Sequence, residues 1–549
     1  MSLRPASFEP VPAETARVAQ AAFPGGNIYM RMRDELGQLY ADEEFAGLFA
    51  VRGQPAEAPW RLALVSIMQF LEGLSDRQAA DSVRSRIDWK YALGLALDDP
   101  GFDASVLSEF RTRLVVGQAE AQLLEKLLTV FKAKGWLKAR GRQRTDATHV
   151  LAAVRKLSLL VTVGETLRYV LNQLAESEPA WLAPHLRSEW RDRYGSRLDE
   201  GRLPKEIAER QALAEMIGRD GLQLWQALQA PETPERVRRH PVVEVLRRVW
   251  TQQFDFSDER VRWRSVDDMP PAAQLINSPY DVEAHVGKKR ETSWSGYKVH
   301  FTETCDDDQP RLITHVLTTP ATTNDCLVPG TIHADLARQD LLPAEHLLDA
   351  GYVEGALIAS GRDTYGLDIV GPAPSSPSWQ AKAQAGFDVS CFSIDWDQQR
   401  VTCPAGQTSV KWSHTHDWHA KPIINIRFPA RACRACAQHT QCTKSAGARH
   451  LTLRPRASHE ALQAARQRQK TPEFRARYKR RAGIEGTFTQ ADRLCGLRRS
   501  RYVGLAKTHL QHVFTAVALN LRRLFAWLEG DPLARTRVAP FVKLMPAAT

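Results

Sequence analysis

Short apolar runs with the spacing of β-strands alternate with segments of helical spacing, and this alternation constrains the fold more than any other feature. Four such runs begin at Tyr297, Leu312, His346 and Leu367. Residues 327–341 and 353–361, which lie between them, have the spacing of crossover helices. A further strand-like run follows Asp146. Strands and helices that alternate in this way predict an α/β fold, with a mixed sheet flanked by helices.

The first 125 residues are predicted to be helical. Apolar residues recur at helical offsets in one segment: Leu64, Ile67, Met68 and Leu71. Ser75 followed by Gln78 forms a capping-box signal that opens a second helix carrying Arg84. The short turn between them permits a helix-turn-helix unit that contacts DNA through Arg84. Such pairs are equally common in helical bundles with no role in DNA binding.

Changes in composition and spacing divide the chain of 549 residues. Two or more domains are expected at this length. The predicted parts are an N-terminal helical domain (1–125), a first part of the sheet domain (126–371) with a helical insertion (about 155–262), a Cys-rich module (372–457), a helical C-terminal part of the sheet domain (458–530) and a tail (531–549).

The net charge of +11 is concentrated in one region. Residues 441–510 carry 17 Lys and Arg against four acidic residues, a local charge of +13. A stretch this basic is typical of a surface that binds a polyanion, with a solvated basic helix as the alternative. No segment approaches the roughly 20 apolar residues of a membrane helix, so we expect a cytoplasmic protein with no membrane partner.

Four of the eight cysteines fall within 40 residues: Cys403, Cys433, Cys436 and Cys442. Four thiolates complete a closed tetrahedral zinc site, so the module predicts one structural Zn²⁺. Unliganded cysteines are the alternative, and His439 is a substitute ligand. Three tryptophans accompany the cluster: Trp396, Trp412 and Trp418. Stacking on a nucleotide is one interpretation of them, and core packing of a small module is the simpler one.

Three carboxylates stand out by their context. Asp146 lies in a predicted strand, Asp349 ends another, and Glu485 lies in the most basic helix. Each alone is more often a turn or cap residue. Together, carboxylates at strand ends and on an adjoining helix predict a site for hard divalent cations. Two such ions about 4 Å apart promote phosphodiester displacement, which is nuclease or transferase chemistry.

The region around Glu485 carries a second pattern. Tyr478, Arg481 and Glu485 are separated by three and four residues, so a continuous helix would present all three on one face. Arg481 is then placed to clamp a phosphate. Neutralisation of Glu485 by the surrounding arginines is the ordinary alternative.

Long segments of this chain, in one order, resemble the DDE transposases of bacterial insertion sequences. They include RGQPAEAPWRLAL, GLSDRQAADSVRSRIDWKYALGL, SPYDVEAHVGKKRETSWSGYKVHFTETCD, ATTND, HLLDAGYV and RAGIEGTFTQADRLCGLRRSRYVGLAKTHLQHVF. The resemblance implies an RNase H-like catalytic core and a DDE triad of Asp146, Asp349 and Glu485 that binds Mg²⁺ or Mn²⁺. It also implies a Tyr-Arg-Glu signature completed by a basic residue, where this chain has Asp492 followed by Arg493.

The resemblance also implies a particular activity. Such enzymes bind terminal inverted repeats, cut DNA with water as nucleophile, and use the freed 3′-hydroxyl to attack target DNA. They commonly act as paired protomers, so a homodimer on DNA is expected, associated with the bacterial nucleoid when bound. A catalytically inactive DNA-binding derivative and a structure-selective, metal-dependent nuclease are the alternatives.

Two further residues are predicted to contact DNA. Lys298 and His300 alternate with apolar neighbours in the strand that begins at Tyr297, so their side chains share one face. We expect this face to approach DNA phosphate near the acids; an exposed polar face of an edge strand is the alternative.

Overall fold

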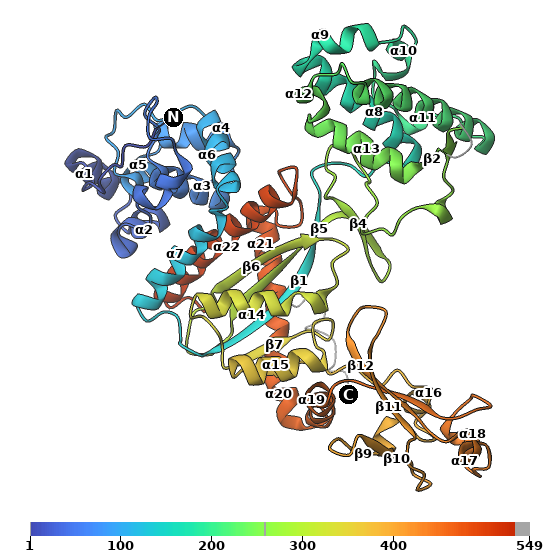
Figure 1. The fold of residues 1–549 in the computed structure, drawn as a ribbon. Coiled ribbons are helices and arrows are strands. Elements are labelled where there is room, and N and C mark those ends of the chain that lie inside the picture. Colours follow the sequence, from blue (N-terminus) through green and yellow to red (C-terminus); the bar gives the residue numbers. More distant parts are fainter. Residues whose placement is uncertain (1, 257–259, 533–549) are drawn as a thin grey trace, which may run out of the picture.

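Six strands of the computed structural model, which describes residues 2–256 and 260–532, form a central mixed sheet (Figure 1). Its main strands pair in the order β6–β5–β1–β7–β8, and β4 pairs with the first part of β5. Their bounds are β1 Arg142–Leu151, β4 His285–Lys289, β5 Thr292–Thr304, β6 Ile313–Pro320, β7 Glu345–Leu348 and β8 Asp368–Val370. The α/β prediction is confirmed in this respect.

The pairing directions place the first two candidate acids on neighbouring strands. β5 runs antiparallel to both β1 and β6, whereas β1, β7 and β8 are parallel. Thr145 of β1 lies opposite Leu348 of β7, so Asp146 and Asp349 follow these paired residues side by side. Parallel neighbours need crossover connections, and α15 (Gly355–Tyr365) connects β7 to its parallel neighbour β8. The helix α14 (Pro329–Arg338) carries the chain from β6 across the sheet to β7, so both predicted crossover helices are present.

The N-terminal helices pack against the last helix, α22 (Leu505–Leu528), and α22 in turn packs against the sheet. They are α1 Ala13–Ala22, α2 Ile28–Leu36, α3 Pro59–Glu72, α4 Asp76–Ser85, α5 Ile87–Leu93, α6 Ser105–Val116 and α7 Glu120–Ala133, with the 3-10 helix η1 Asp42–Leu48. Phe70 of α3 stacks on Phe514 of α22, with ring centroids 5.3 Å apart. The predicted capping box forms, since Ser75 and Gln78 cap α4 reciprocally. One continuous apolar core therefore joins the helices from α2 to α7 to the sheet, whereas α1 packs in a small separate cluster through Ala19.

A separate apolar core lies in the helical block between β1 and β4, at the top of Figure 1. This block contains α8 Leu159–Ser177, α9 Pro179–Leu182, α10 Trp190–Tyr194, α11 Ile207–Gln229, α12 Glu235–Arg238 and α13 Pro241–Gln253, the short strands β2 Phe254–Asp255 and β3 Arg262–Trp263, and the 3-10 helices η2 Ala183–His185, η3 Glu200–Arg202 and η5 Val266–Asp268. Apolar residues at helical spacing along α8, from Leu160 to Leu174, line this core, and the helical character predicted for this insertion is observed.

The segment rich in cysteine has a third, small apolar core, built around Val401, Ile424 and Phe428. Its elements are α16 Trp379–Ala383, η7 Val389–Cys391, β9 Ser393–Asp395, β10 Arg400–Thr402, β11 Lys411–His416, β12 Pro422–Arg427, α17 Ala430–Arg434, α18 His439–Cys442 and β13 His450–Leu453. The chain then returns to the sheet through α19 Arg456–Arg468, α20 Pro472–Tyr478, η8 Lys479–Gly483 and α21 Ile484–Cys495.

Two observations complete the fold. Within the described ranges, the helices are all too short or too polar to cross a membrane. The predicted tail, residues 531–549, lies outside the described residues except for Asp531 and Pro532.

Candidate active site

Asp146 and Asp349 form the centre of the candidate site. Asp146 is buried in β1, and one of its carboxylate oxygens accepts a hydrogen bond of 2.7 Å from the Ala147 backbone N–H. Burial raises the pKa of Asp146, and the negative charge of Asp349 raises it further, against the opposing effects of the Ala147 N–H and Arg481. The two acids are therefore close enough to interact electrostatically.

Tyr478, at the end of α20, and Arg481, in the 3-10 helix η8 that follows, close the site. The Arg481 guanidinium donates to the Asp146 carboxylate, and the Tyr478 hydroxyl lies 3.5 Å from an oxygen of Asp349. The guanidinium carbon also lies 5.9 Å from the centre of the Tyr478 ring. Burial raises the pKa of Tyr478 to about 12, with Asp349 and Asp146 also raising it and Arg481 lowering it. The phenol stays protonated and can act as a donor.

Glu485 does not join these four side chains in the structure. Tyr478 ends α20, Arg481 lies in the 3-10 helix η8, and Glu485 lies in the first turn of α21. The 3-10 helix has three residues per turn, so Tyr478, Arg481 and Glu485 do not share the single face that a continuous α-helix would give them. Glu485 is exposed, and among the described residues its carboxylate has no hydrogen-bond or ion-pair partner. In that part of the chain, no three His, Cys, Asp or Glu side chains are gathered closely enough to hold a metal ion.

The polar face of β5 lies inside the protein rather than at an edge, because β5 pairs on both sides. His300 is completely buried, with its ring nitrogens 2.7 Å from the Tyr352 hydroxyl and 3.2 Å from the Thr319 hydroxyl. The Lys298 ammonium pairs with Asp325 at 2.8 Å. His300 therefore has no surface to offer DNA in this conformation, and Lys298 is already engaged.

The remaining predicted DNA contacts are exposed. Arg493 lies on the outer side of α21, and Arg84 is largely exposed on α4, where its Nε donates to the Pro100 carbonyl. Asp492, which stands where the resembling family has a basic residue, accepts a 3.0 Å hydrogen bond from the Arg498 backbone N–H. This contact gives Asp492 a structural role at the end of α21.

Three of the residues around the site were not predicted from the sequence: Tyr352, Asp325 and Glu303. Tyr352 carries the hydrogen bond to His300, and Asp325 holds Lys298. Glu303 is a buried acid that accepts bonds from two arginines. Tyr352 and Glu303 lie beside predicted strand ends and Asp325 lies just before a predicted helix, but a lone polar residue in such a place is usually a turn or cap.

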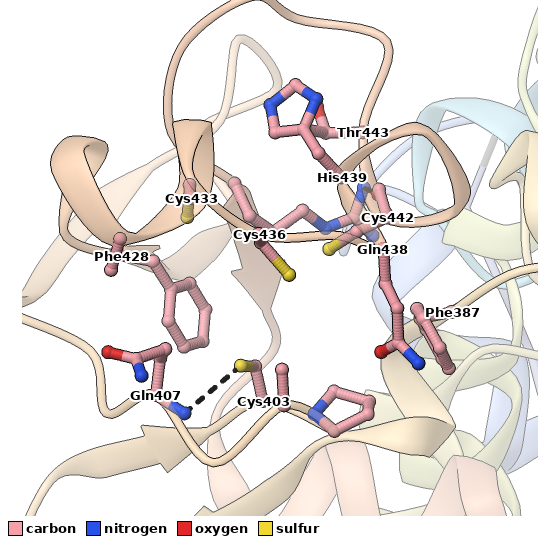
Figure 2. Close-up of a pocket in the computed structure, with 14 residues that line it drawn as sticks. Phe387, Cys403, Gln407, Phe428, Cys433, Cys436, Gln438, His439, Cys442 and Thr443 are labelled. Atoms are coloured by element: carbon pink, nitrogen blue, oxygen red, sulfur yellow. Dashed lines mark hydrogen bonds between the residues drawn. The ribbon is translucent and has the colours of Figure 1, made fainter.

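The four clustered cysteines line one pocket at the edge of the small apolar core (Figure 2). Cys403 follows β10, Cys433 lies on α17, Cys436 follows α17, and Cys442 ends α18. Burial raises the pKa of Cys442, and the other three thiols raise it as well, whereas Arg449 lowers it. This mutual influence is that of thiols sharing one site. Four convergent sulfur donors suit zinc, although they are not gathered at coordination distances here.

The three tryptophans of this segment differ in exposure. Trp396 and Trp412 pack edge to face, with centroids 5.6 Å apart, against the small apolar core. Trp418 is 90% exposed, in the turn between β11 and β12, beside the ring of His419. Core packing thus accounts for two of the tryptophans and leaves Trp418 without a structural role.

Two family models match this chain. A transposase domain family (DUF772) matches residues 17–113, which run from the middle of α1 through α5 and into α6. A transposase DDE domain family matches residues 402–525, from the cysteine pocket through Tyr478, Arg481 and Glu485 into α22. A search of curated proteins found no match. The chain therefore carries a match to a transposase domain near its N-terminal end and to a transposase DDE domain near its C-terminal end, a pair of matches consistent with a DDE transposase of an insertion sequence.

Proposed function

We propose that this protein binds the terminal inverted repeats of its element and catalyses metal-dependent DNA cleavage and strand transfer. The observation that carries the proposal is the pair of acids on neighbouring parallel strands, contacted by the Tyr478 and Arg481 side chains of the matched DDE region. The strand order β6–β5–β1–β7–β8, with the first three strands antiparallel and the rest parallel, supports an RNase H-like core.

Asp146, Asp349 and Glu485 are the residues that would hold Mg²⁺ or Mn²⁺. Such ions, when bound, activate the attacking oxygen and stabilise the leaving oxygen of a phosphodiester. Arg481 forms an ion pair with the Asp146 carboxylate. When that carboxylate is otherwise engaged, the guanidinium is free to clamp a DNA phosphate. Tyr478, protonated and beside Asp349, positions the same phosphate by donating a hydrogen bond.

DNA reaches this site along the basic C-terminal region. Arg493 on α21 and the lysines and arginines of residues 441–510 supply phosphate contacts, which position DNA without reading its sequence. The Lys298 ammonium also contacts a DNA phosphate when its ion pair with Asp325 breaks. The N-terminal helices, with Arg84 on α4, form a second DNA-binding part, and two protomers act together on a pair of element ends.

The activity is tested with the purified chain, Mg²⁺ and DNA that carries the element's terminal repeats. We expect cleavage at the ends and joining to target DNA, and no comparable cleavage of scrambled DNA of equal length. Equal cleavage of both substrates would identify a general nuclease instead. Binding of the repeats without any cleavage would identify an inactive derivative.

The cysteine pocket is proposed to hold one structural zinc ion. Metal analysis of the purified chain is expected to give about one zinc per chain. Substituting both Cys433→Ser and Cys436→Ser should remove the zinc and lower the melting temperature, because ligand loss removes folding free energy. Cys391→Ser, at an exposed cysteine of the same segment, is the matched control. Unchanged zinc content and melting in the double variant would exclude this site.

Trp418 is proposed to stack on a nucleotide of bound DNA. Trp418→Ala should leave the melting temperature unchanged, since the side chain is exposed, but should weaken binding to end DNA by about 1–3 kcal/mol, the range for one base stacked on an aromatic ring. Trp396→Ala is the contrasting variant, and it should lower stability because Trp396 packs on the apolar core. Unaltered DNA affinity in Trp418→Ala would leave this residue without a role in binding.

A further inference from the structure

A buried carboxylate, Glu303 of β5, lies at the junction of the strand and helices that carry the candidate site. It is 0% exposed. One of its oxygens accepts a 2.7 Å hydrogen bond from Arg144 Nε, with Arg144 Nη2 also 2.6 Å away. The other accepts bonds of 2.6 Å from the Thr487 hydroxyl and 2.9 Å from Arg523 Nη1. Every contact comes from a different element: β1, α21 and α22.

Arg144 connects this carboxylate to the strand of Asp146. Arg144 and Asp146 are two residues apart in β1, so their side chains share one face, and Arg144 lies directly opposite Glu303. The same guanidinium donates to the Arg480 carbonyl in η8. A Cβ at Gly483 would lie 2.2 Å from Arg144 Nη1. The turn that presents Arg481 therefore rests directly on Arg144.

Thr487 connects the carboxylate to the helix of Glu485. Thr487 lies two residues after Glu485 in α21 and is buried. Arg523 braces this helix further, because its Nη2 donates to Thr487 and its Nε donates to Gln490 of the same helix, at 2.7 and 2.9 Å. The first two turns of α21 are thus fixed against the sheet by polar contacts that meet at Glu303.

The negative charge of Glu303 and the positive charges of the two arginines stabilise one another. Burial alone would raise the pKa of Glu303, but the charges of Arg523 and Arg144 and the hydrogen bond from Thr487 outweigh it, and the pKa is lowered. Apolar side chains of similar volume commonly serve stability as well as a buried ion pair does. A charged cluster instead fixes the geometry of the groups it joins, because each bond has a required direction.

We propose that Glu303 is a positioning residue for strand cleavage, holding η8 and α21 so that Arg481 and Glu485 keep a fixed position relative to β1, the strand of Asp146. The inference rests on the proposed function and adds a residue outside the triad. It explains how the first turn of α21, which carries the exposed Glu485 and contacts neither aspartate, keeps a fixed position relative to them.

The test uses Thr487→Val, which removes one hydrogen bond from α21 to Glu303 and keeps the side-chain shape. Thr515→Val is the matched control, because Thr515 is also buried in a helix and lies beside α21, where it contacts Cys495, but its hydroxyl donates to the Gln511 carbonyl of its own helix and not to Glu303. Cleavage of end DNA is measured against Mg²⁺ concentration for the full-length chain and both variants. Melting temperature and DNA affinity are measured in parallel.

We expect the Mg²⁺ concentration for half-maximal cleavage to rise about 10-fold in Thr487→Val, the scale seen when a residue supporting metal ligands is lost. Thr515→Val should follow the wild type, and DNA affinity should be equal in all three. Glu303→Gln should shift the Mg²⁺ dependence further in the same direction. The inference is overturned if Thr487→Val and Thr515→Val have the same Mg²⁺ dependence. Absence of cleavage by the wild type would instead overturn the proposed function.

Discussion

Asp146→Asn is expected to abolish DNA cleavage while leaving DNA binding intact. The carboxylate is buried, interacts with Asp349 and is paired with Arg481, so the amide would remove a cation ligand without changing the side-chain volume. Loss of several kcal/mol of transition-state stabilisation corresponds to a rate reduction of about a thousandfold or more. Cleavage of end DNA and a gel-shift assay of binding measure the two properties separately.

Asp363→Asn is the control for this substitution, because Asp363 is an exposed acid on α15, away from the two aspartates. It should cleave like the wild type. Asp349→Asn should reproduce the loss seen in Asp146→Asn. Undiminished cleavage by Asp146→Asn would remove this residue from the reaction, and loss of DNA binding would show that the amide disturbs the fold.

The second large expected effect is a loss of stability in mild acid. Four completely or almost completely buried histidines hold hydrogen bonds among the sheet and its helices: His300, His333, His346 and His512. Burial lowers the pKa of His300 and His333 to about 4 and that of His512 to about 3, and it lowers that of His346 well below the usual value. All four are neutral in the folded protein at pH 7.

The direction of the effect follows from proton binding. Below the ordinary histidine pKa of 6.5, the unfolded chain takes up protons that the folded chain does not, so stability falls with pH until the folded pKa is reached. Each histidine contributes about 1.4 kcal/mol per pH unit, hence about 2 kcal/mol between pH 6.5 and 5. Four of them amount to about 8 kcal/mol, comparable with the whole stability of a domain.

Denaturant unfolding at pH 7.5 and pH 5 measures this loss. His512→Leu should reduce the pH dependence, since it removes one of these histidines, whose Nε2 has no partner among the described residues. His419→Gln, at a histidine beside the exposed Trp418, should leave the dependence unchanged. Equal stability at the two pH values would show that these histidines are not buried neutral in solution.

Much of the sheet could be predicted because its strands are short, apolar and separated by clear helical spacing. The runs beginning at Tyr297, Leu312, His346 and Leu367 all form strands at or within two residues of these positions, apart from β5, which starts earlier at Thr292. Asp146 and Asp349 were found for the same reason, since each occupies or ends such a run. Their pairing follows from parallel strand order, which the alternation of elements implies.

The role of His300 could not be predicted, because burial of a polar strand face depends on what covers it. Alternation shows that Lys298 and His300 share a face but not that α14 and α15 pack over that side of the sheet. The role of Glu303 could not be predicted either, because its partners come from three distant parts of the chain: Arg144, Thr487 and Arg523. The sequence also did not predict the 3-10 helix η8 between α20 and α21, since 3-10 and α-helical spacing differ little over five residues.

The proposed binding of divalent ions by Asp146, Asp349 and Glu485 together is tested most directly at Glu485. Mn²⁺ binding to the full-length protein on end DNA is measured by electron paramagnetic resonance for the wild type and Glu485→Gln, with Glu473→Gln, on the preceding helix, as control. We expect Glu485→Gln to bind Mn²⁺ much more weakly than the wild type and the control. Equal Mn²⁺ binding by all three proteins would show that Glu485 is not a ligand of these ions.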